Sequence, residues 1–143
     1  MKKYLLFLYV GILSFHSCQS QKNNLRTIEG NWHPLSQQEG ADQYIEIFIK
    51  KDTIYFYSTP LGLYWVNFKM NENKYFIDDR TEMGWVEKGF MFVENDTLNF
   101  KAIDGSPLQF IRINESTTLE NFVTQTTTED VYRNVFLRRA QNW

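Results

Sequence analysis

The stretch YIEIFIKKDTIYFYS, residues 44–58, sets the fold class. Isoleucine occupies every second position from Ile45 to Ile49, and Ile54 and Phe56 continue the alternation after a polar break at 50–52. Alternation with a period of two is typical of β-strands, and a short polar break between two such runs indicates a tight turn. The stretch therefore predicts a β-hairpin.

Further segments of the same kind follow at a spacing of roughly ten residues. We expect strands at 61–70, 75–77, 83–86, 90–93, 98–103 and 108–113, and another around Trp32. The breaks at Asn95-Asp96 and at 104–107 (DGSP) are turn-forming sequences. Eight or nine short strands with no helical period between them predict an all-β fold, either an antiparallel up-and-down barrel or a sandwich. Closure of about eight strands into a barrel would remove both sheet edges.

A helix is predicted after the strands, over residues 128–141. The preceding Thr126-Thr127-Thr128-Glu129 has the form of a capping box. One apolar stripe then runs along the helix, made of Tyr132, Val135, Phe136, Ala140 and Trp143. Arg138 and Arg139 suit the negative end of the helix dipole. We expect the stripe to pack on the outer wall of the sheet, the alternative being a helix reserved for a protein partner. Residues 116–128 are expected to be a polar link whose few apolar side chains lie against the barrel.

The first 18 residues, MKKYLLFLYVGILSFHSC, have the features of an export signal. Lys2 and Lys3 precede an uncharged, mostly apolar run over residues 4–15, and Ser17 provides a small residue for cleavage. The run is shorter than the roughly 20 residues that a helix needs to cross a bilayer. The sequence therefore predicts a signal peptide over residues 1–17.

Cys18 is the only cysteine of the chain. Its position resembles that in bacterial lipoprotein signals, where the cysteine is lipidated and becomes the first residue of the mature protein. The two positions before Ser17 hold Phe15 and His16, whereas that family usually has leucine and a small residue there. The resemblance implies a lipid anchor on Cys18, a tether over 18–26, and a place in the bacterial cell envelope, facing the periplasm from the outer membrane. The alternative is a free thiol in the tail of a signal peptide.

The pattern Leu25-x-x-Ile28-x-Gly30-Asn31-Trp32 resembles the opening of lipocalins and of small bacterial lipocalin-like lipoproteins. For residues 27–143 this resemblance implies a lipocalin-like barrel with a helix on its outer wall. In that family the tryptophan of the Gly-x-Trp motif closes one end of the barrel, which implies this role for Gly30 and Trp32. Arg112 then corresponds to an arginine that covers the tryptophan ring through a cation–π contact. The alternatives are a Trp32 in the core of a β-sandwich and an Arg112 that points into solvent.

Composition argues against several functional classes. The formal net charge is −2, and removal of residues 1–17 takes away two lysines and no acid, which leaves −4. Such a charge gives no reason to expect a nucleic-acid partner. After the signal peptide the chain has a single histidine, His33, and the carboxylates Asp78, Asp79 and Glu82 are interpreted as part of a charged turn with Arg80. We therefore expect no catalysis, no cofactor and no metal site.

The sequence favours a lipid-anchored envelope protein that holds a small apolar or amphipathic ligand inside the barrel. We expect the cavity to be lined by Ile45, Ile47, Phe56, Tyr64, Phe68, Phe92 and Phe100. The alternative is an envelope interaction module, such as an inhibitor, immunity or assembly lipoprotein, which has a filled barrel and a protein partner. The two hypotheses differ in whether the interior of the barrel is hollow.

Overall fold

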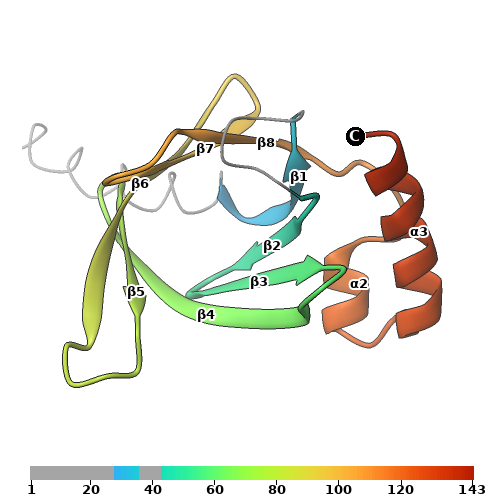
Figure 1. Cartoon of the computed structure of the whole chain (residues 1–143), viewed down its shortest axis with the longest axis horizontal. Helices are drawn as coiled ribbons and strands as arrows, with labels where there is room; N and C mark the ends of the chain where they lie inside the picture. Colours follow the sequence, from blue (N-terminus) through green and yellow to red (C-terminus); the bar gives the residue numbers. More distant parts are fainter. Residues whose placement is uncertain (1–27, 36–42) are drawn as a thin grey trace, which may run out of the picture.

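The computed structural model describes residues 28–35 and 43–143 of the chain. These residues form a closed barrel in which every strand pairs antiparallel with its neighbours in sequence and the first strand pairs with the last (Figure 1). The strands are β1 (Gly30–Pro34), β2 (Glu46–Lys50), β3 (Thr53–Ser58), β4 (Gly62–Asn71), β5 (Lys74–Asp78), β6 (Trp85–Glu94), β7 (Thr97–Ala102) and β8 (Leu108–Arg112). The predicted all-β up-and-down barrel of about eight strands is confirmed.

The prediction of two separate strands at 83–86 and 90–93 is wrong, because one long strand, β6, runs without a break from Trp85 to Glu94. Gly89 joins them with a φ of +138°, and a Cβ at this position would lie 2.0 Å from the carbonyl oxygen of Lys101. On the neighbouring strand the pairing register shifts between Tyr75 and Phe76. These features define a β-bulge, which bends a strand without ending it. In the sequence, a bulge glycine and a turn glycine look alike.

Apolar side chains from the strands fill most of the barrel interior. Trp32, Ile49, Ile54, Met91 and Leu98 are each completely or almost completely buried there. On β2, Ile47 and Ile49 belong to this interior cluster and Phe48 between them belongs to a cluster on the outer face, as the pleat of a sheet requires. The interior is therefore largely a packed core.

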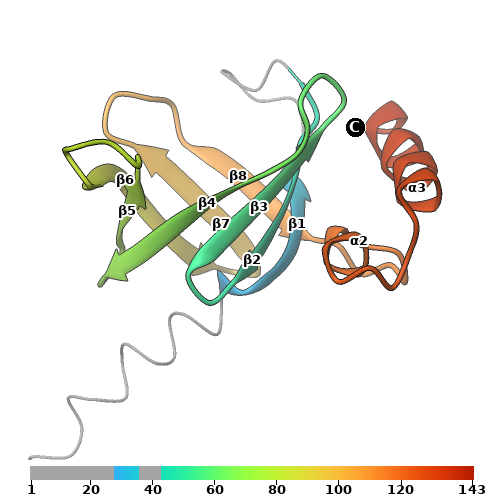
Figure 2. The same ribbon diagram turned by 90° about the horizontal axis from the view of Figure 1, so that it is seen from below.

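Two helices, α2 (Leu119–Val123) and α3 (Glu129–Gln141), pack side by side on the outer wall of the barrel (Figures 1 and 2). A second apolar cluster lies between these helices and the outer faces of β2 and β3. Its buried members are Tyr44, Phe48, Tyr57, Leu119, Tyr132 and Phe136. This cluster explains why β2 and β3 carry apolar side chains on both faces, and it confirms the predicted C-terminal helix.

The helix α3 begins where the sequence predicted it, but its capping interaction differs. Thr128 caps α3 by accepting a hydrogen bond from the backbone N–H of Val131, so no capping box forms between Thr126 and Glu129. A capping box lies instead at the start of α2, between Thr118 and Asn121. Residues 119–123 were predicted to be part of a polar link, because five residues are too few to show a helical period.

The predicted signal peptide, Cys18 and the tether lie outside the described residues. Among the residues described, no helix has the length and apolar character needed to cross a membrane.

Candidate functional site

Trp32 is fully buried in the interior cluster of the barrel. The centre of its ring lies 4.1 Å from the guanidinium carbon of Arg112, so the predicted cation–π contact is confirmed. The indole N–H donates a hydrogen bond to the carbonyl of Ile28 at 2.9 Å, and Arg112 Nη1 donates one to the carbonyl of Glu29 at 2.9 Å. A Cβ on Gly30 would lie 2.6 Å from Arg112 Nη1, so glycine leaves room for the arginine.

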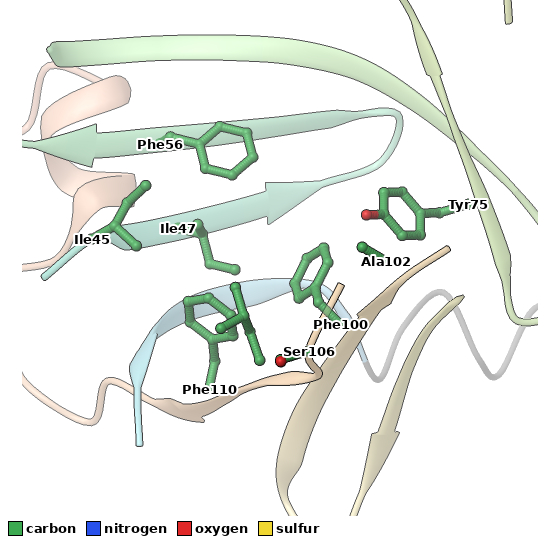
Figure 3. A pocket seen from close by; sticks show the side chains of 9 residues that line it. Ile45, Ile47, Phe56, Tyr75, Phe100, Ala102, Ser106 and Phe110 are labelled. Carbon is green, nitrogen blue, oxygen red and sulfur yellow. The ribbon is translucent and has the colours of Figure 1, made fainter. Parts of the chain in front are cut away.

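A pocket of about 180 Å³ lies in the interior toward the turn between β7 and β8, and it is partly open (Figure 3). On these two strands the lining positions are Phe100, Ala102, Leu108 and Phe110, whereas Leu98 and Arg112 at the opposite strand ends take no part. The full lining is Ile45, Ile47, Phe56, Tyr75, Phe100, Ala102, Ser106, Leu108 and Phe110. The pocket is therefore an unfilled part of an otherwise packed core.

The structure brings four of the seven predicted lining residues together around this pocket, namely Ile45, Ile47, Phe56 and Phe100. Phe68 is buried in the packed core instead. Tyr64 stacks in parallel on Phe56, with ring centres 4.9 Å apart, but it is not part of the lining.

The inward orientation predicted for Phe92 is wrong. Phe92 pairs with Asn99, and its neighbours Met91 and Val93 are the residues that join the interior cluster. All four residues from Phe90 to Val93 are apolar, so alternation in the sequence does not indicate which pair faces inward. The bulge at Gly89 determines the orientation, and its position emerges only from the pairing of β5 with β6.

Five further residues line the pocket that were not predicted from the sequence: Tyr75, Ala102, Ser106, Leu108 and Phe110. Alternation from Arg112 back along β8 would have found Leu108 and Phe110, because all three share one face of the strand. On β7, Ala102 lies two residues after Phe100 and shares its face, so the same reasoning would have found it. Ser106 had no such signal, because it lies in the turn between β7 and β8.

The lining of the pocket is almost entirely apolar. Its polar groups are the hydroxyls of Tyr75 and Ser106, and no charged side chain belongs to the lining as the structure describes it. Burial raises the pKa of Tyr75, so this hydroxyl stays neutral at physiological pH. Asp78 and Asp79 accept hydrogen bonds from the backbone N–H groups of Arg80 and Thr81, which makes them part of a turn outside the pocket. Among the described residues, no group of three or more His, Cys, Asp or Glu side chains is arranged to hold a metal ion.

A buried ion pair attaches α3 to the barrel. Glu46 on β2 is fully buried, and Arg139 binds its carboxylate through Nε at 2.6 Å and Nη2 at 2.9 Å. The hydroxyls of Tyr44 and Tyr132 donate to the same carboxylate, each at 2.9 Å. Every charged atom of the pair is thus satisfied, which is the condition for a buried ion pair to be tolerated. This network holds the helix in place.

A second hollow, of about 570 Å³, lies beside the end of α3. Its lining includes Glu115, Arg138 and Arg139. Both arginines form salt bridges with Glu115, and Arg139 also binds Glu46. Because its charges are paired among themselves, this hollow is a weaker candidate for ligand binding than the apolar pocket.

We expect the protein to lose stability above about pH 10, the ordinary pKa of tyrosine. Burial and the Glu46 carboxylate raise the pKa of Tyr44 and of Tyr132. A raised tyrosine pKa means that the folded chain keeps protons that the unfolded chain loses, so stability is complete below pH 10 and falls as the pH rises further. Urea unfolding between pH 8 and pH 11 measures the effect. The Tyr44→Phe/Tyr132→Phe variant should show a shallower decline, and an equal decline in both proteins would contradict the explanation.

Comparison of the chain with protein-family models, with curated proteins and with solved structures gives no match in any of the three.

Proposed function

We propose that the chain binds a small apolar molecule, about the size of one aromatic ring, in the pocket beside the β7–β8 turn. The observation that supports this proposal is the hollow of about 180 Å³ in an interior that is otherwise filled with apolar side chains. Well-packed cores contain few voids larger than a water molecule. A partly open apolar hollow of this size is therefore best explained by an occupant.

The volume limits the size of the ligand. Pockets for drug-sized molecules measure roughly 300–1,000 Å³. An apolar cavity of about 150 Å³ holds a benzene molecule. At about 180 Å³, the pocket fits one ring or the end of a short apolar chain. An amphipathic ligand would place its apolar end in the pocket and its polar end toward the opening.

We expect weak binding. Removing about 150 Å² of apolar surface from water contributes ~4 kcal/mol at about 25 cal/mol per Å². This free energy corresponds to a dissociation constant of about 1 mM. Toluene should therefore bind saturably in ligand-observed NMR titrations at millimolar concentration.

A pair of variants tests whether the pocket is responsible. Ala102 and Ile103 are both exposed, but only Ala102 belongs to the lining of the pocket. Ala102→Phe should fill the hollow and weaken toluene binding at least tenfold, and Ile103→Phe should leave the dissociation constant unchanged. Equal affinities for both variants would contradict binding in this pocket.

We further propose that the protein is exported, lipidated on Cys18 and held in the cell envelope, facing the periplasm from the outer membrane. The signal-like segment over residues 1–17 and the position of Cys18 support this location. Cys18→Ser should release the protein from the membrane fraction and abolish its labelling with palmitate. A variant that still fractionates with membranes would contradict the lipid anchor.

A second candidate function is that of an envelope protein with a protein partner. The exposed aromatic side chains on the outer face of the barrel favour it, because Trp65 and Trp85 are both about half exposed. Lys69 lies over the ring of Trp85, with its Nζ atom 4.7 Å from the ring centre. A stoichiometric partner that copurifies with the wild-type protein from solubilised envelope, and is lost with Trp85→Ala, would favour this function.

A further inference from the structure

The tyrosine in the pocket has a hydroxyl without a protein partner. Tyr75 is 8% exposed, and Figure 3 shows its hydroxyl pointing into the pocket from β5. Within the part of the chain that the structure describes, this hydroxyl makes no hydrogen bond to another residue. The oxygen is not one of the fully buried polar atoms that lack a partner, so it keeps contact with the solvent of the partly open pocket. A tyrosine hydroxyl whose ring is buried usually has a hydrogen-bond partner, and here the space for one is the pocket.

The ring of Tyr75 is held so that its hydroxyl keeps this direction. It packs edge-to-face against Phe100, with ring centres 5.6 Å apart. On the next strand it pairs with Gly89, the bulge glycine, which has no side chain to displace it. The hydroxyl is thus a preorganised hydrogen-bonding group in an apolar wall.

We infer that the ligand of this pocket is an aromatic ring with a hydroxyl substituent, a compound of the phenol class, whose oxygen hydrogen-bonds to the hydroxyl of Tyr75. The inference rests on the proposed binding function and adds the chemistry of the ligand to it. The ring of the ligand would lie among the aromatic side chains of the lining, Phe56, Phe100 and Phe110. A purely hydrocarbon ligand would fill the same volume but would leave the Tyr75 hydroxyl without a partner.

Phenol and toluene test this inference, because they are nearly equal in size and differ by a hydroxyl against a methyl group. The dissociation constants of both are measured for the full chain, for Tyr75→Phe and for Tyr55→Phe. Tyr55 is the control, since it stacks on Phe48 as part of the outer cluster beneath the helices. We expect Tyr75→Phe to weaken phenol binding about five- to tenfold, the effect of one hydrogen bond. Toluene binding should stay the same or improve, and Tyr55→Phe should change neither ligand.

The outcomes separate this inference from the proposed function. If both compounds bind the wild-type protein and Tyr75→Phe weakens both equally or neither, the phenol inference is wrong and the binding function stands. If neither compound binds the wild-type protein, both are wrong. A second readout needs no variant: phenol should move the Tyr75 Cζ resonance of the wild-type protein more than toluene does. Equal shifts with the two compounds would overturn the inference.

Discussion

Replacing Arg139 by methionine should lower the free energy of unfolding by about 3–5 kcal/mol, the usual cost of removing one partner of a buried ion pair. The side chain of Arg139 is 8% exposed and its partner Glu46 is fully buried. Without the guanidinium, the Glu46 carboxylate would keep only the two tyrosine hydroxyls as hydrogen-bond donors. We expect α3 to loosen from the barrel before the strands unfold.

The neighbouring arginine is a matched control. Arg138 is on the same helix and also forms a salt bridge with Glu115, but its side chain is 62% exposed. Exposed ion pairs contribute about 0–1 kcal/mol, so Arg138→Met should have an effect within that range. Urea unfolding at pH 7 measures both variants. Similar losses for Arg138→Met and Arg139→Met would show that burial of the pair is not what stabilises the helix.

Trp32→Ala should destabilise the barrel by about 3–5 kcal/mol, the range found when a buried aromatic side chain is truncated. Trp32 is 0% exposed, and the variant loses the contact with Arg112 as well as the packing. Trp85→Ala is the control, because Trp85 is 42% exposed and also has a cation over its ring, that of Lys69.

Comparing these variants separates the contribution of ring burial at Trp32 from that of its cation–π contact with Arg112. A cation–π contact at an exposed position contributes about 0.5–1 kcal/mol, and with the burial of only part of its ring Trp85→Ala should cost clearly less than Trp32→Ala. Arg112→Met should cost less than Trp32→Ala, because the ring itself stays buried. Thermal and urea unfolding provide the measurements. A Trp32→Ala variant as stable as Trp85→Ala would contradict a large contribution of the buried Trp32 ring to the stability of the barrel.

The sequence contained enough information to predict the barrel, because local patterns determine most of it. Alternation along Ile45–Ile49 indicated the inward face of β2, and turn-forming residues marked most of the strand ends. The Gly-x-Trp pattern led to the contact between Trp32 and Arg112. In each of these cases the information lies within one short segment or in a known pattern.

The remaining features depend on contacts between distant segments. Glu46 and Arg139 are 93 residues apart. No local pattern indicates that a glutamate in an apolar strand forms an ion pair with an arginine on the last helix. The bulge at Gly89 appears only when β6 pairs with β5 and β7. The pocket is a small difference between the space inside the barrel and the side chains that fill it. Its volume therefore could not be predicted from the sequence.

The most direct test of the binding pocket is a toluene titration of the wild-type protein, followed through the methyl resonances of isoleucine and leucine. Ile45, Ile47 and Leu108 line the pocket, whereas Ile49 and Ile54 are buried elsewhere in the same interior and serve as internal controls. We predict saturable shifts of the first three methyl sets, with the other two unchanged. The absence of any saturable shift, or shifts of Ile49 and Ile54 as large as those of the lining residues, would contradict a ligand site in this pocket.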